Sequence, residues 1–97
     1  FRGAMTEQYV CQQLIGRMDF IYYWSAENSR GEIDFLVQHR ERVIPIEVKA
    51  EENLKSKSLS AFVARYPSLH AVRFSMSDYR EQDWMTNVPL YGIQTNI

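Results

Sequence analysis

Two runs of alternating residues, joined by a short link, constrain the fold of this chain more than any other feature. The runs cover residues 32–38 and 43–49, and both are typical of β-strands. If the hairpin is centred on Arg40 and Glu41, apolar residues oppose each other on one face, because side chains alternate along a strand. A shift by one residue would destroy this sorting, so the pattern predicts the register. The link lacks Gly and Asn, and we therefore expect a slightly longer or strained loop rather than a tight two-residue turn.

Charged residues meet on the other face of the predicted hairpin. The apolar face pairs Ile33 with Val48, Phe35 with Ile46 and Val37 with Ile44; the other face pairs Glu32 with Lys49, Asp34 with Glu47 and Leu36 with Pro45. Like charges that oppose each other across two strands destabilise the pair unless something neutralises them. The two facing carboxylates of Asp34 and Glu47 therefore favour a bound cation.

A divalent metal ion is the cation that these residues suit best. Mg²⁺ binds one or two carboxylates and fills its remaining positions with water and phosphate oxygens. We expect Asp34, Glu47 and the backbone carbonyl of Val48 to hold Mg²⁺ or Mn²⁺. Lys49 points to the same side, where it would orient or help to deprotonate an attacking water, or stabilise charge on a phosphate. The alternative is that Glu32 and Asp34 form ordinary cross-strand ion pairs with Lys49.

A helix is predicted over residues 3–15, and it carries an unexpected carboxylate. The residues that share its apolar stripe, at spacings of three and four, are Gly3, Glu7, Val10, Cys11 and Leu14. Gly16 is a suitable stop signal. A carboxylate inside an apolar stripe needs a partner, a metal or a polar pocket, so Glu7 is expected to complete an outer metal shell. The alternative is a helix-start carboxylate that interacts with the helix dipole.

The middle of the chain predicts a further strand and a second helix. Residues 20–24 are dense in aromatic and β-branched side chains and predict a strand, whereas residues 25–31 have turn chemistry. A second helix is expected over residues 58–66, ended by Pro67. The residues on its expected buried face are Leu59, Phe62, Val63 and Tyr66.

The last third of the chain predicts two strands separated by a loop. We expect a strand over residues 69–76, a polar loop over 77–87 anchored by Trp84 and Met85, and a short strand over 89–93 that starts with proline. The element order is α-β-β-β-α-β(-β). This order predicts an α/β fold of the mixed α+β kind, with a central mixed sheet flanked by helices and a single domain over the whole chain.

Composition limits the location and the partners of the protein. A chain of 97 residues forms one small domain, and a net charge of −1 gives no global basic field for nucleic acid. Local candidates for tracking a phosphate backbone are Lys55, Lys57 and Arg65, although charges at a helix start are often simply solvated. The single cysteine, Cys11, fits a reducing cytoplasm. We see no membrane-length apolar run and no signal peptide. The start at Phe1, without Met, suggests a fragment of a longer protein.

Several motifs carry a resemblance to a known family. They are Gly3-Ala4-x-x-Glu7-x-x-Val10, Tyr22-Tyr23-Trp24, Glu32-Ile33-Asp34-Phe35, Ile44-Pro45-Ile46-Glu47-Val48-Lys49-Ala50, Lys57-Ser58-Leu59 and Pro89-Leu90-Tyr91. The chain resembles the C-terminal domain of a group of prokaryotic AAA-type ATPases, catalogued as domain of unknown function 4143. That family is regarded as part of the PD-(D/E)XK, restriction-endonuclease-like superfamily.

The resemblance implies a fold, a site and a neighbouring domain. It implies a restriction-endonuclease-like sheet, and it implies an ATPase domain upstream in the full protein. Asp34, Glu47 and Lys49 match the superfamily signature, and Glu7 matches the acidic residue of the first helix. Ile33 stands before Asp34 where the signature has proline, a change that such families commonly tolerate.

Three functional hypotheses follow. The first is a Mg²⁺- or Mn²⁺-dependent nuclease, with DNA or RNA as substrate. The second is a catalytically silent module that docks DNA, a protein or a second copy of itself; strand 20–24 would favour such pairing if it lies at a sheet edge and is not covered. The third is a stable cap whose charged residues form an ion-pair network.

Overall fold

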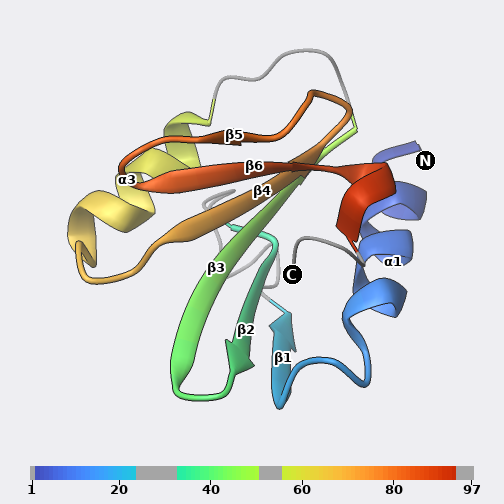
Figure 1. The fold of residues 1–97 in the computed structure, drawn as a ribbon, viewed down its shortest axis with the longest axis horizontal. Coiled ribbons are helices and arrows are strands. Elements are labelled where there is room, and N and C mark those ends of the chain that lie inside the picture. Colours follow the sequence, from blue (N-terminus) through green and yellow to red (C-terminus); the bar gives the residue numbers. More distant parts are fainter. Residues whose placement is uncertain (1, 24–32, 51–55, 94–97) are drawn as a thin grey trace.

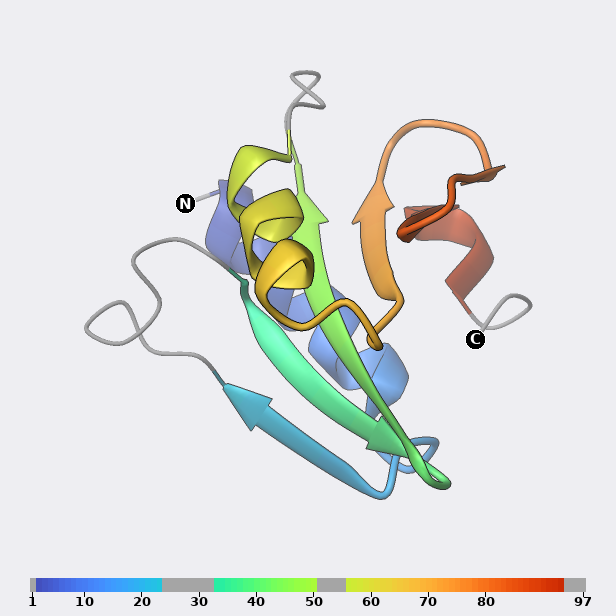
Figure 2. The same ribbon diagram turned by 90° about the vertical axis from the view of Figure 1, so that its left-hand side faces the viewer.

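The computed structural model describes residues 2–23, 33–50 and 56–93, which form one mixed sheet with an α-helix on each face (Figures 1 and 2). The strands are β1 (Phe20–Tyr23), β2 (Phe35–His39), β3 (Arg42–Lys49), β4 (Ala71–Ser75), β5 (Arg80–Glu81) and β6 (Met85–Pro89). The α-helices are α1 (Arg2–Leu14) and α3 (Lys57–Arg65), and a 3₁₀ turn, Leu90–Gly92, follows β6. Within these ranges, no helix is long and apolar enough to cross a membrane.

The sheet combines an antiparallel half with a parallel half. Its strand order is β1-β2-β3-β4-β6-β5. Strands β1, β2 and β3 form an antiparallel meander, strands β3, β4 and β6 run parallel, and β5 pairs antiparallel with β6. Helix α3 lies in the crossover between the parallel neighbours β3 and β4, as such neighbours require. The prediction of a mixed α+β fold is confirmed.

The central hairpin has the predicted register. Phe35 pairs with Ile46, and the pairing continues to the turn. The loop holds only Arg40 and Glu41, so the expectation of a longer loop is wrong. The expected strain is present instead, because Arg40 has a φ of 59°, a left-handed conformation that disfavours side chains with a Cβ. The Asp19 carboxylate accepts a hydrogen bond of 2.8 Å from the Arg40 N–H and so supports this turn.

Two apolar cores lie on the two faces of the sheet. The core on the α1 face contains Val10, Cys11, Leu14, Phe35, Val37, Ile44, Ile46, Val72, Phe74, Val88 and Ile93. The core on the α3 face contains Ile33, Leu59, Phe62, Val63, Ala71 and Met85. Each large apolar side chain that is buried contributes about 1.5–3 kcal/mol. Strands β3 and β4 lie between the two cores and are therefore the most deeply buried part of the sheet.

Both helices end one residue before the predicted position, and one expected core residue is exposed. Gly16 has a φ of 85° directly after α1, which is the glycine stop that was expected. Helix α3 ends at Arg65, before Pro67. Tyr66 was predicted to be buried, yet 46% of it is exposed. The reason is that Tyr66 caps the helix instead of continuing it, so its ring packs beside Phe62 at 5.0 Å between centroids.

The C-terminal third differs most from expectation. The stretch 77–87 was predicted to be a loop, but it contains β5 and the start of β6. Strand β6 forms although its sequence lacks an alternating apolar pattern. It pairs with β4 and β5 inside the sheet, and Arg73 donates a hydrogen bond to its polar residue Asn87. Pro89 ends β6 rather than beginning a strand. Met85 is buried as predicted, and Trp84 packs partly against the α3 core.

Strand β1 forms one edge of the sheet. Phe20 and Tyr22 are 55% and 56% exposed on that edge, so the described residues do not cover them. A separate difference from prediction is that Ile33 packs on the opposite face of the sheet from Phe35 and Val37. Ile33 precedes β2 and packs in the α3 core, because the chain bends at Asp34. The predicted turn over 25–31 lies outside the described residues.

Candidate functional site

A row of polar side chains crosses four adjacent strands of the sheet. The partners in register are Glu47 of β3, Arg73 of β4, Asn87 of β6 and Arg80 of β5. Residues that are paired in this way project from the same face. Ala71, two residues before Arg73, belongs to the α3 core, so the row lies on the α3 face. Arg73 and Asn87 are the central residues of β4 and β6, and Glu47 lies two residues before the end of β3.

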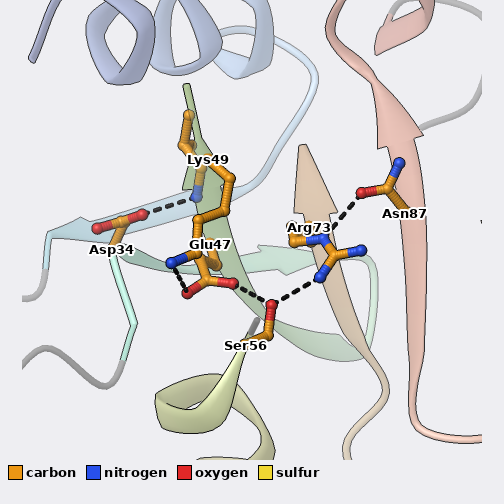
Figure 3. Close-up of polar contacts among 7 residues, drawn as sticks. Asp34, Glu47, Lys49, Ser56, Arg73 and Asn87 are labelled. Atoms are coloured by element: carbon orange, nitrogen blue, oxygen red, sulfur yellow. Dashed lines mark hydrogen bonds and ion pairs between the residues drawn. The ribbon is translucent and has the colours of Figure 1, made fainter. Parts of the chain in front are cut away.

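Glu47 is the buried carboxylate of the row. Only 8% of the residue is exposed. Its Oε2 accepts a hydrogen bond of 2.7 Å from the hydroxyl of Ser56, and its Oε1 lies 3.8 Å from Nζ of Lys49 (Figure 3). Burial raises the pKa of Glu47 above its ordinary value, and the charge of Asp34 raises it further against the opposing effects of Ser56, Lys49 and Arg73.

Asp34 reaches the same strand from the bend that precedes β2. Its backbone N–H donates to the carbonyl of Ile46 at 2.9 Å, and its Oδ2 accepts from the N–H of Val48 at 2.7 Å. Asp34 therefore stands beside β3 where the β2–β3 strand pairing has ended, rather than within the ladder as predicted. Burial raises the pKa of Asp34, although the Val48 N–H and the charge of Lys49 partly oppose this shift.

The backbone of Val48 offers a further oxygen at this position. In a strand, the N–H and C=O of one residue point to the same edge. Because the Val48 N–H points at Asp34, the Val48 carbonyl faces the same edge, beyond the last pair between β2 and β3. Asp34 lies near enough to Glu47 for its charge to raise the pKa of Glu47, and the Val48 carbonyl faces the edge on which Asp34 lies.

Lys49 and Glu7 approach these carboxylates from different elements. The side chain of Lys49 is 31% exposed and lowers the pKa of both Asp34 and Glu47. Glu7 projects from α1; burial raises its pKa, and the charge of Asp34 raises it further. In the ranges that the structure describes, no group of three or more His, Cys, Asp or Glu side chains is placed to hold a metal. Glu7 is therefore an electrostatic neighbour of Asp34 and not a third ligand as the side chains stand.

Ser56, Arg73 and Asn87 form a network that was not predicted. Arg73 is 6% exposed; it donates from Nη1 to the Ser56 hydroxyl and from Nε to Oδ1 of Asn87, both at 2.8 Å (Figure 3). Asn87 Oδ1 also accepts from the hydroxyl of Ser75 at 2.7 Å. The one signal in the sequence is an arginine in the middle of an apolar strand, the same kind of anomaly as Glu7 in its helix.

Comparison with known proteins identifies the family. The family model described as "Domain of unknown function (DUF4143)" matches residues 2–93. This chain belongs to the DUF4143 family. Comparisons with curated proteins and with solved structures give no significant match. The match confirms the predicted resemblance to domain of unknown function 4143, and the matched span of this DUF4143 domain includes Glu7, Asp34, Glu47 and Lys49.

Two of the three basic residues expected to track phosphates in this DUF4143 domain are described, and they lie at opposite ends of α3. Lys55 lies outside the described residues. Lys57 is exposed at the first turn of α3, next to Ser56 and hence near the site. Arg65 lies at the other end of α3, about 12 Å along the helix axis, and its guanidinium sits over the ring of Tyr66. Of the two described residues, only Lys57 remains a candidate contact.

Replacing Ser56 by alanine should destabilise this DUF4143 domain. We expect the free energy of unfolding to fall by about 1–3 kcal/mol, because a buried carboxylate and a buried guanidinium each lose a hydrogen-bond partner. Urea unfolding measures the loss. Ser56→Thr keeps the hydroxyl and is the matched control. Equal losses in the two variants would contradict a role for the hydroxyl.

Proposed function

We propose that this DUF4143 domain is a nuclease that hydrolyses phosphodiester bonds with the help of Mg²⁺ or Mn²⁺. The observation that carries the proposal is the pair of largely buried carboxylates, Asp34 and Glu47, beside Lys49 at the carboxyl end of β3. Burial raises the pKa of both carboxyls, and their mutual repulsion adds to that of Glu47. A cation relieves both effects, because it stabilises the ionised carboxylates.

The donor atoms fit a hard divalent ion. Asp34 uses Oδ2 and Glu47 uses Oε2 for hydrogen bonds, so the oxygen ligands would be Asp34 Oδ1, the Val48 carbonyl and Glu47 Oε1, which also lies 3.8 Å from Nζ of Lys49. Mg²⁺ is typically bound by one or two carboxylates together with substrate phosphate oxygens. When bound, such an ion would supply Lewis acidity and lower the pKa of a water molecule. Glu7 adds negative charge behind Asp34.

Lys49 supplies the positive charge that the protein itself brings to the reaction. Its ammonium group lies 3.8 Å from Glu47 Oε1 and remains partly exposed, so a substrate phosphate can reach it. There it would stabilise charge that develops on the phosphate, or orient the attacking water. Ser56 and Arg73 act behind Glu47 and hold its second oxygen in place.

We also propose the wider setting that the motifs suggest. The mixed sheet, the preceding α1 with Glu7, and the carboxylates on neighbouring strands support membership of the PD-(D/E)XK superfamily with its restriction-endonuclease-like fold. An AAA-type ATPase domain upstream in the same protein would control access to nucleic acid. The cytoplasm remains the predicted location.

The test is cleavage of supercoiled plasmid and of linear single-stranded DNA in Mn²⁺. We expect the wild-type protein to nick the plasmid, and Asp34→Asn and Lys49→Ala to reduce the rate by at least about a hundredfold. Glu41→Gln removes an exposed carboxylate at the hairpin tip and should cleave normally. Equal nicking by the wild type and Asp34→Asn, or no cleavage by the wild type in either Mn²⁺ or Mg²⁺, would contradict the proposal.

A second candidate function is docking without catalysis. It is favoured by one observation: in the described part of the chain no three-ligand group exists, and both carboxylates already accept internal hydrogen bonds. Such a module would bind DNA in a salt-sensitive manner without cutting it. Its binding would survive Glu47→Gln, whereas cleavage by a nuclease would not. The exposed edge strand β1 would serve pairing with a protein partner or a second copy.

A further inference from the structure

A hollow lies beside the polar row on the side away from Asp34. Its volume is about 520 Å³, and its lining includes Arg73, Arg80, Asn87, Ser77 and Asp78. This volume falls within the range of about 300–1,000 Å³ that ligand sites commonly have. Arg73 is almost fully buried, so it forms the floor of the hollow, whereas Arg80 is exposed at its rim.

Two guanidinium groups share this hollow. Arg73 and Arg80 both flank Asn87 in register, on strands that are two positions apart, which places their backbones about 10 Å apart. Burial lowers the pKa of Arg73, the charge of Glu47 opposes this shift, and the charge of Arg80 adds to it. Among the described residues of the lining, Asp78 is the one acidic residue, and no ion pair joins it to Arg80. A positive pair of this kind attracts an anion, as the carboxylate pair attracts a cation.

The walls of the hollow are held in place by the same network that holds Glu47. Asn87 donates from Nδ2 to the carbonyls of Ser77 and Asp78, at 3.1 and 3.0 Å, and so secures the loop after β4. Arg73 is linked to Glu47 through the Ser56 hydroxyl by contacts of 2.8 and 2.7 Å (Figure 3). The hollow is therefore connected to the candidate metal site by hydrogen bonds that pass through Ser56.

We propose that Arg73 and Arg80 bind the phosphate backbone of a nucleic-acid strand and hold it across the sheet beside Asp34 and Glu47. This inference rests on the proposed nuclease function. Guanidinium groups bind phosphate oxygens through paired hydrogen bonds, which gives orientation as well as attraction. A row that is negative at β3 and positive at β4 and β5 would place metal and backbone side by side. The chain needs no global basic field for such a contact.

The test is binding of a fluorescein-labelled, mixed-sequence single-stranded DNA oligonucleotide in metal-free buffer with EDTA, followed by fluorescence anisotropy. We expect Arg80→Ala to weaken binding about tenfold. The slope of log K against log salt should fall by about 0.7 for each phosphate contact that is lost. The matched control is Arg42→Ala, an exposed arginine at the other end of β3, about 23 Å from Lys49 along the strand. It should bind within about twofold of the wild type.

Arg73→Lys tests the buried arginine and should also weaken oligonucleotide binding. A thermal melt first shows whether this variant is folded. If it is not, the result for Arg80→Ala alone decides whether the proposal stands. The proposal is overturned if Arg80→Ala binds like Arg42→Ala. It is also overturned if calorimetry shows that inorganic phosphate binds as tightly as the oligonucleotide, because the hollow would then serve a free anion. Binding that depends on Arg80 without plasmid nicking would refute the nuclease alone. Nicking whose KM is unchanged in Arg80→Ala would refute the phosphate contact alone.

Discussion

Neutralising either carboxylate of the site should make the metal-free protein more stable at neutral pH. Burial raises the pKa of Asp34 and of Glu47, so the fold disfavours the charged form of each. Asp34→Asn keeps an oxygen for the Val48 N–H, and Glu47→Gln keeps one for Ser56. We expect melting temperatures to rise by a few degrees, since each kcal/mol shifts Tm by about 4–8 °C for a domain of this size. Thermal melts in EDTA measure the effect.

The pH dependence of the same melts gives the sign of the effect. A carboxyl whose pKa is higher in the folded than in the unfolded state binds its proton more tightly when folded. These groups therefore favour the fold below the unfolded pKa of about 4, and that contribution is lost as the pH rises through the raised folded pKa. The gap in Tm between Asp34→Asn and the wild type should be small in acid and should open toward neutral pH.

Metal and a matched control complete the first prediction. Mn²⁺ should raise the Tm of the wild type, because a ligand that binds only the folded state stabilises it, but not that of Asp34→Asn. Glu41→Gln should change neither value, since Glu41 is exposed at the hairpin tip. Lower stability of both amide variants at neutral pH would instead indicate that the cluster is a stabilising ion-pair network.

The second large effect is expected at Arg73. Arg73→Met should lower the free energy of unfolding by about 1–3 kcal/mol, because Ser56 and Asn87 each lose a buried hydrogen-bond partner and Glu47 loses a favourable nearby charge. Small domains are stable by only about 5–15 kcal/mol, so this loss is substantial. Urea unfolding at neutral pH measures it. Arg42→Met, the same change at an exposed position, should alter stability by less than about 0.5 kcal/mol.

A double variant identifies the cause of that loss. If part of the destabilisation comes from the charge of Glu47, which Arg73 helps Lys49 to balance, then adding Glu47→Gln to Arg73→Met should recover that part. Residues in one network typically couple by about 0.5–3 kcal/mol. Strictly additive losses in the double variant would show that Arg73 stabilises the fold through packing and Asn87 rather than through Glu47.

The hairpin and the two helices could be predicted because their signals are local. The pairing of Phe35 with Ile46 follows from alternation on two strands that are close in the chain, where only one register buries the apolar residues. The apolar spacing within each helix defined α1 and α3 in the same manner, and Gly16 marked the end of α1. The turn at Arg40 is also local, but its residues do not indicate whether a longer loop or a strained two-residue loop forms.

The C-terminal strands could not be predicted because their signals are not local. Strand β6 has Thr86 and Asn87 at its centre, which is typical of a loop. It is a strand because β4 on one side and β5 on the other satisfy its backbone, and because Arg73 satisfies the Asn87 side chain. Such pairing depends on partners that the parallel crossover brings together. No sequence pattern within residues 77–89 indicates these partners.

The residues of the candidate site also differ in whether their positions follow from local or from long-range pairing. That Asp34 lies near Glu47 and Lys49 could be predicted from the sequence, because one hairpin joins them, but Asp34 lies at the bend before β2 and not opposite Glu47 in the ladder. Only the tertiary structure decided that Ser56, Arg73 and Arg80 belong beside them, because the parallel order of β3, β4 and β6 aligns residues far apart in the chain. Short-range alternation thus determines the carboxylates, whereas long-range strand pairing determines the cations that balance them.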